Sequence, residues 1–231
     1  MEKKYGKPIA LCCLGLLIGL IVIVFFVRPI NLSGDESSWD IEYKGVKYRG
    51  EAFYCADDDR KFIGHIKNGA AVYTVGNAKD PRYILIQGDD NSGCFIADGT
   101  NVPTSGKVTK VLIDPGIRED NSRYLSTDEE LDVISEIGGI KGKIEKFEIE
   151  NYYTDGNSFY YVYDDSNVSS CDNYGGYVAY TNGKWIYSAP SERDKIEWVG
   201  NNRAVISGVV IDDEKLISRM CETALTKYIE Y

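Results

Sequence analysis

Few motifs in this chain of 231 residues point to nucleophilic or general-base catalysis. The one histidine, His65, stands in the strand-like run Ile63-Gly64-His65-Ile66. A histidine-based triad would depend on this side chain alone, and no G-x-S-x-G turn is present. Phosphate-binding loops of the Walker or GxGxxG type are also absent. We therefore expect no triad and no cofactor, and a surface or edge position for His65.

Acidic clusters provide oxygen atoms that could hold a metal ion. They lie in three expected loops, at Asp57-Asp58-Asp59, Asp89-Asp90-Asn91 and Asp164-Asp165-Ser166-Asn167. None completes a calcium-binding EF-hand, because the last position of a loop that starts at Asp89 is Thr100 rather than glutamate. Acidic loop tips are commonly just solvated, so we predict no metal site. A pair of carboxylates could also serve a glycoside hydrolase, although the spacing selects no particular pair.

Aromatic residues are the other side chains with a functional interpretation, and they are dense after residue 150. They are Tyr152, Tyr153, Phe159, Tyr160, Tyr161, Tyr163, Tyr174, Tyr177, Tyr180, Trp185 and Tyr187. Strand alternation would expose some of them, and exposed tyrosines make good contacts with proteins and sugars. We predict a binding face around the Asn182-Gly183 hairpin, formed by Tyr177, Tyr180, Trp185 and Tyr187. In the competing interpretation, tyrosine simply suits strands and many of these rings belong to the core.

Four cysteines follow the first 40 residues, and they have two interpretations. An even number in an oxidising compartment indicates two disulfides, for which three pairings exist. We favour Cys55–Cys94 and Cys171–Cys221, because each bond then closes a loop within one half of the chain. Buried free thiols are the alternative, since Cys221 also fits the apolar face of a helix. No CxxC spacing is present, which argues against zinc.

An uncharged apolar run extends from Ile9 to Val27. At about 1.5 Å per residue it is roughly 28 Å long as a helix, which matches a hydrocarbon core of about 30 Å. Basic residues precede it, at Lys3, Lys4 and Lys7, so we expect a cytoplasmic N-terminus and a C-terminal domain outside the cell. A cleaved signal peptide is the alternative, but the run is long and no small-x-small site follows it.

Two glycines in this run, Gly15 and Gly19, form a GxxxG pattern. Such a pattern lets two membrane helices approach closely, so the chain could form a homodimer through this helix. Glycine is also common in membrane helices that do not associate.

The charge of the chain is acidic and excludes one class of partner. Its 26 Lys and Arg residues stand against 36 Asp and Glu, for a net charge of −10 at pH 7. Such a chain does not bind nucleic acid electrostatically. The charge would suit a basic partner, and solubility explains it equally well.

The rest of the chain predicts an α+β fold in two parts. From residue 39 to 115, short alternating runs stand between turn residues, which favours a β-rich subdomain of five to seven antiparallel strands. From 116 to 231, the capping box Ser126-Thr127-Asp128-Glu129 predicts a helix that ends at Gly138-Gly139. Strands, the Asn182-Gly183 hairpin and a C-terminal amphipathic helix after Asp213 follow. A single domain would also accommodate this length.

The predicted organisation is a cytoplasmic tip (1–8), a transmembrane helix (9–27), a tether (28–38) and the two outer subdomains. Some turn-and-strand motifs within the first subdomain form a recognisable pattern, namely Tyr43-Lys44-Gly45, Ile63-Gly64, Val72-Tyr73-Thr74-Val75 and Asp80-Pro81-Arg82-Tyr83-Ile84-Leu85-Ile86. This pattern resembles that of uncharacterised, membrane-anchored or lipid-anchored outer proteins of Gram-positive bacteria. The resemblance implies an anchored outer protein and carries over no active site.

Together these features predict a single-pass cell-membrane protein whose outer domain binds or senses an unidentified protein or envelope partner without catalysis. A cell-envelope hydrolase that uses carboxylates is the first alternative. A structural subunit of an envelope complex is the second.

Overall fold

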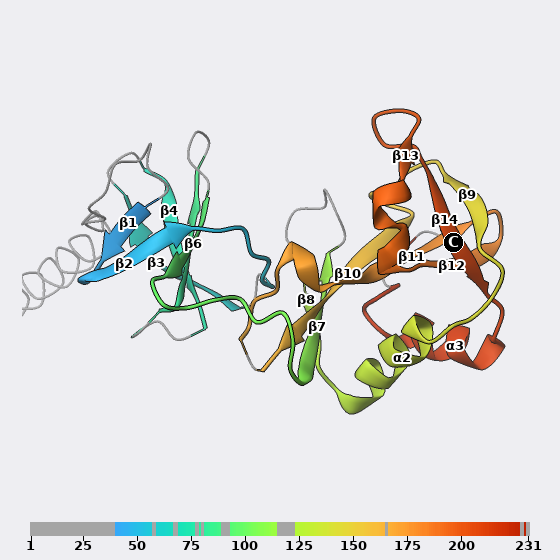
Figure 1. The fold of residues 1–231 in the computed structure, drawn as a ribbon, viewed down its shortest axis with the longest axis horizontal. Coiled ribbons are helices and arrows are strands. Elements are labelled where there is room, and N and C mark those ends of the chain that lie inside the picture. The colour runs from blue at the N-terminus through green and yellow to red at the C-terminus, as the bar shows by residue number, and fades with distance from the viewer. Residues whose placement is uncertain are drawn as a thin grey trace, which may run out of the picture. The chain divides into compact units, whose positions relative to one another are not determined.

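The computed structural model describes residues 40–56, 59–66, 69–76, 79, 81–88, 93–114, 123–164, 166–226 and 229. The chain divides into two compact units (Figure 1). The first consists of residues up to Glu51 and of Lys61–Gly99, and the second of Ala52–Arg60 and Thr100–Tyr231. The second unit therefore draws on two separate segments of the sequence.

The first unit is built on a six-stranded sheet. In chain order its strands are β1 (Asp40–Tyr43), β2 (Val46–Gly50), β3 (Arg60–His65), β4 (Ala71–Val75), β5 (Tyr83–Gln87) and β6 (Gly93–Ala97), and they lie in the order β1-β2-β6-β5-β4-β3. One face carries a small apolar core that includes Tyr48, Val72 and Ile84. The Tyr48 hydroxyl donates a hydrogen bond to the carbonyl of Pro81 at 2.7 Å, which satisfies this buried polar atom.

The second unit is built on an eight-stranded sheet with two α-helices. Its strands are β7 (Val108–Asp114), β8 (Arg123–Leu125), β9 (Glu145–Ile149), β10 (Gly156–Tyr163), β11 (Tyr174–Thr181), β12 (Lys184–Ser188), β13 (Glu197–Trp198) and β14 (Ala204–Ile211). Seven of them follow the order β13-β14-β12-β11-β10-β7-β8, and β9 pairs with β14. The helices are α2 (Asp128–Gly138) and α3 (Glu214–Glu222), and the 3₁₀ turns are η2 (Cys171–Asn173) and η3 (Pro190–Lys195).

The two faces of this sheet have separate apolar cores, because successive side chains of a strand point to opposite sides. Phe159 and Val178 belong to the core that α2 and α3 cover, and these helices lie together on one side of the sheet (Figure 1). Tyr160 and Tyr177 belong to the core of the opposite face. The face without α-helices thus carries Tyr160 of β10 and Tyr174 and Tyr177 of β11.

The segment Ala52–Arg60 is attached to the second unit by a backbone bridge. Tyr54 and Ser169 exchange two N–H···O bonds, each 2.8 Å long. Ala56 is fully buried in the core of the face without helices, and its N–H donates to the Tyr124 hydroxyl at 3.2 Å. Ala52–Arg60 is therefore part of the packed structure of this unit.

Two local predictions are tested by backbone detail. The Asn182-Gly183 hairpin is confirmed: β11 and β12 pair across it, and both turn residues have positive φ, at 51° and 74°. The capping box at the start of α2 is present one residue later than expected. Thr127 caps the helix and Glu130 reaches back to its N–H, because Thr127 rather than Ser126 holds the extended N-cap conformation.

The predicted fold class, α+β with an N-terminal transmembrane helix, is wrong. The described part of the chain is mostly β-sheet, arranged as two antiparallel sheets, and its α-helices have only 11 and 9 residues. The alternating runs after residue 116 form strands that dominate that half, so the two helices only cover one face of a sheet. None of the helices in the described ranges is long and apolar enough to cross a membrane, so the predicted transmembrane character has no support there.

The predictions for the N-terminal region concern residues outside the described part. These are the tip (1–8), the apolar run 9–27 with Gly15 and Gly19, and the tether (28–38).

Candidate functional site

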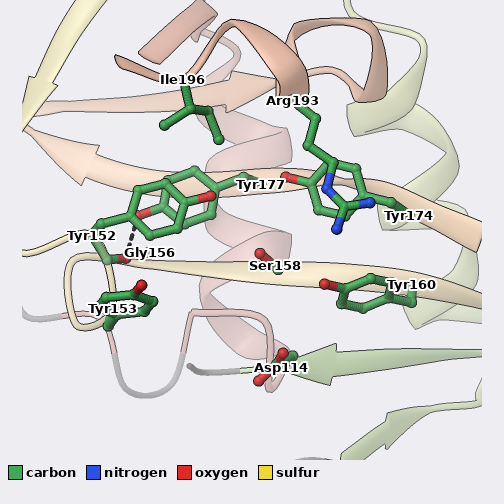
Figure 2. A pocket seen from close by; sticks show the side chains of 10 residues that line it. All are labelled: Asp114, Tyr152, Tyr153, Gly156, Ser158, Tyr160, Tyr174, Tyr177, Arg193 and Ile196. Carbon is green, nitrogen blue, oxygen red and sulfur yellow. Dashed lines mark hydrogen bonds between the residues drawn. The ribbon is translucent and has the colours of Figure 1, made fainter. Parts of the chain in front are cut away.

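A pocket of about 190 Å³ lies on the face of the second sheet that has no α-helix (Figure 2). Ten residues line it, and because half of them are tyrosines we call it the tyrosine pocket. They are Asp114, Tyr152, Tyr153, Gly156, Ser158, Tyr160, Tyr174, Tyr177, Arg193 and Ile196. Three neighbouring strands, β7, β10 and β11, supply its floor, and η3 supplies Arg193.

Strand register explains why distant residues meet on this floor. Ser158 of β10 pairs with Asp114 of β7 on one side and with Tyr177 of β11 on the other. Directly paired residues of antiparallel strands have Cβ atoms about 4.5–5.5 Å apart on the same face. A carboxylate, a hydroxyl and a phenol therefore form one row across the sheet.

The aromatic wall of the pocket is held by ring contacts. Tyr152 and Tyr177 stack with centroids 4.4 Å apart and planes inclined by 1°, and the Tyr177 hydroxyl donates to the Tyr152 carbonyl at 2.6 Å. Gly156 makes this possible, since a Cβ there would lie 2.3 Å from the Tyr177 hydroxyl. Tyr160 meets Tyr174 edge-on at 5.4 Å. The wall is therefore formed before any ligand arrives.

Arg193 enters the pocket in a fixed orientation. Its Nη1 donates to the carbonyl of Cys171 at 3.0 Å, and its guanidinium carbon lies 4.7 Å from the centroid of the Tyr174 ring. A guanidinium over an aromatic face is attracted by the ring quadrupole. These two contacts aim the cation at the cavity beside Ser158, as Figure 2 shows.

The pocket phenols are kept in their neutral form. Burial raises the pKa of Tyr160, Tyr174 and Tyr177 well above the ordinary value of 10.0. Arg193 lowers the pKa of Tyr174, but by less than burial raises it. These hydroxyls therefore remain hydrogen-bond donors near neutral pH and are poor bases or nucleophiles.

Alkaline titration should show directly that these buried phenols keep their protons. Phenols with raised pKa values, including Tyr187 at about 12, should stay protonated in the folded protein while exposed tyrosines ionise near pH 10. Because the unfolded chain loses these protons first, folding stability should be intact below pH 10 and fall as pH rises through the folded-state values. Phenolate absorbance recorded against pH, with circular dichroism as the control for folding, measures both. Complete tyrosine ionisation near pH 10 in a folded protein would contradict the expectation.

The structure separates the four residues of the predicted binding face. Tyr177 lines the pocket, but Trp185 and Tyr187 are 6% and 5% exposed in the core beneath the helices. Tyr180 is half-buried and packs against that same core. The predicted exposed face around the hairpin is therefore not formed. Tyr177 and Tyr180 are an odd number of positions apart, so strand alternation sends them to opposite faces.

The predicted disulfide between Cys171 and Cys221 is not formed either, and both residues are free thiols. Cys171 is exposed in η2, with its Sγ 3.8 Å from Asp172 Oδ1. Cys221 lies on α3 and packs against the core beneath the helices, as the alternative interpretation expected. Cys55 is buried in the second unit and Cys94 is half-buried in β6 of the first. The disulfide predicted between Cys55 and Cys94 stays a prediction.

The other candidates from the sequence form no site in the described ranges. His65 is exposed on β3, with its ring 4.9 Å from that of Phe62. Within the described residues, no group of three His, Cys, Asp or Glu side chains could hold a metal ion. Asp57, Asp58, 89–91 and Asp165 lie outside them.

Sequence reasoning missed Asp114, Ser158 and Arg193. One available signal was the alternation Gly156, Ser158, Tyr160 along β10, which sets small and polar residues beside aromatic ones on a single face. No local signal marked Arg193, because its contact with Tyr174 depends on how η3 returns over the sheet. Comparisons of the chain with protein-family models, with curated proteins and with solved structures found no match.

Proposed function

We propose that the second unit is a non-enzymatic binding module and that its ligand occupies the tyrosine pocket. The observation that carries this proposal is an aromatic wall whose rings are already fixed by ring contacts and whose phenols are neutral. A pocket formed in advance binds without the entropic cost of ordering its side chains.

Binding is favoured over hydrolysis by the acid groups of the pocket. Glycoside hydrolases generally flank the scissile bond with two carboxyl groups. Asp114 is the single carboxylate among the described residues that line this pocket. Among the described residues, the lining therefore supplies one of the two acids that the envelope hydrolase, the first alternative, would use at this site.

The size of the pocket limits what enters it. Pockets for drug-sized ligands are typically about 300–1,000 Å³, so a cavity of about 190 Å³ suits a small molecule or one group of a larger one. Trp198 lies next to the wall, 5.0 Å from Tyr152 between ring centroids, and is 49% exposed. A larger ligand would contact this ring outside the pocket.

Removing one pocket hydroxyl should weaken binding without disturbing the fold. Tyr160→Phe keeps the ring in its contacts with Tyr54 and Tyr174 and removes the hydroxyl, which also hydrogen-bonds with Tyr54. We expect the affinity of a compound that binds the wild-type protein to fall roughly tenfold, because a lost hydrogen bond costs about 1–1.5 kcal/mol. Ligand-observed NMR with the purified full-length protein and a library of small polar compounds supplies the compound, and a titration gives the affinity.

Tyr163→Phe is the matched control, since Tyr163 lies on the same strand but does not line the pocket. Equal affinities for the Tyr160→Phe and Tyr163→Phe variants would contradict the proposal, as would a library without any binder. The predicted extracytoplasmic location and protein partner stay predictions.

A further inference from the structure

We infer that the tyrosine pocket binds a small zwitterion of the α-amino acid class, with the ligand carboxylate on Arg193 and its ammonium group on Asp114. This inference rests on the proposed function and adds the chemical class of the ligand.

Opposite charges face the same small cavity. Arg193 and Asp114 lie on opposite sides of Ser158, the first above β10 and the second at the end of β7 (Figure 2). Both also act on one phenol: burial raises the pKa of Tyr160 most, Asp114 raises it further and Arg193 lowers it. A ligand with a single charge would therefore meet a like charge on one side of the pocket. A zwitterion pairs both groups at once.

The Arg193 end has the geometry that a carboxylate needs. A guanidinium presents its N–H donors in a planar fork that matches two carboxylate oxygens. The contacts with the Cys171 carbonyl and the Tyr174 ring set the plane of that fork in advance. The Tyr174 hydroxyl, which also hydrogen-bonds with the hydroxyls of Ser158 and Tyr152, lies beside the cation.

The Asp114 end has the acceptors that an ammonium group needs. An ammonium group has three donors and no acceptor, so it requires oxygen atoms around it. Strand register sets the Ser158 side chain beside the Asp114 carboxylate on the same face. The ring of Tyr160, two positions along β10 from Ser158, adds an aromatic surface that attracts a cation.

The volume is consistent with a ligand of this kind. A cavity of about 190 Å³ has room for roughly six water molecules at about 30 Å³ each, so it takes the charged core of one amino acid. A neutral sugar would use the hydroxyls and leave both charges without a counter-charge in the ligand, and a simple anion would offer none to Asp114. Both are therefore discriminating probes.

The first experiment titrates the full-length protein with each common α-amino acid by calorimetry. The amino acid that binds is then compared with its methyl ester, which lacks the carboxylate charge, and with its N-acetyl derivative, which lacks the ammonium charge. We expect each derivative to bind roughly tenfold more weakly or worse, because each loses one charge-assisted interaction. Failure of all the amino acids to bind overturns the inference.

Charge variants assign each half of the ligand to its residue. Arg193→Gln should weaken binding of the amino acid but not of its methyl ester, and Asp114→Asn should weaken the amino acid but not its N-acetyl derivative. Arg82→Gln, on the first unit and outside the pocket, is the control and should leave all three affinities unchanged. Equal losses for both derivatives in either pocket variant overturn the assignment. Circular dichroism establishes that each variant is folded.

The same titrations separate failure of the inference from failure of the proposed function. Glucose, inorganic phosphate or an amine-free carboxylate that binds as tightly as any amino acid, with weakening by Tyr160→Phe, overturns the zwitterion and leaves the pocket as a binding site. Absence of binding by every one of these probes overturns both.

Discussion

Replacing Tyr177 by alanine is expected to lower the free energy of unfolding of the second unit by about 3–5 kcal/mol, the usual cost of removing a buried aromatic ring. Tyr177 is 1% exposed, and its ring stacks on Tyr152 at 4.4 Å. The substitution leaves a cavity beside β10 and removes the stacking contact that holds Tyr152 in the pocket wall. Urea denaturation followed by the fluorescence of Trp185 and Trp198, both in this unit, measures the change.

Tyr177→Phe is the matched comparison because it keeps the ring and removes the hydroxyl. Its expected cost is about 1–3 kcal/mol, since the Tyr152 carbonyl loses a partner 2.6 Å away. If alanine costs no more than phenylalanine at this position, the stacked ring does not hold the wall.

Replacing Gly176 by alanine should lower the free energy of unfolding by about 2–6 kcal/mol, from backbone strain and overpacking together. Gly176 has φ of +141°, and an added Cβ would lie 2.4 Å from the Tyr187 ring and 2.9 Å from the Ser188 carbonyl oxygen. The backbone atom cannot move aside without breaking the β11–β12 pairing. The same urea titration gives the value.

Gly183→Ala separates the two contributions to this loss. Gly183 also has positive φ, +74°, but a Cβ there meets nothing within 4 Å. Only strain should remain, at about 1–2 kcal/mol. Equal costs at Gly176 and Gly183 would exclude crowding against Tyr187 and Ser188 as a cause.

Local chemistry made some of the fold predictable. The Asn182-Gly183 turn needs two residues that tolerate positive φ, and these two do so wherever they stand. The capping residues and the periodic apolar residues of Asp128–Gly138 predict a helix there. The predicted fold class was wrong because short strands have weaker sequence patterns than helices. The two helices therefore received more weight than the eight strands of the second unit.

The site depends on information that local patterns do not contain. Asp114 and Ser158 meet because β7 and β10 pair in one particular register. In the sequence, α2 and β9 lie between these two strands. The aromatic content identified the right region, yet only Tyr177 of the four chosen residues lines the pocket. The prediction of the other three residues did not take into account which face of the sheet each side chain occupies. The number of positions between two residues of one strand determines whether they share a face.

The attachment of Ala52–Arg60 determines how the chain can be divided. A fragment that starts at residue 100 loses the two backbone bonds of Ser169 to Tyr54 and the buried Ala56. A fragment that starts at Ala52 keeps them, but it also carries Lys61–Gly99 without β1 and β2, which complete the other sheet. No single cut in the gene yields both units whole. Recombination that moves the whole second unit to another protein therefore has to move Lys61–Gly99 of the first unit as well.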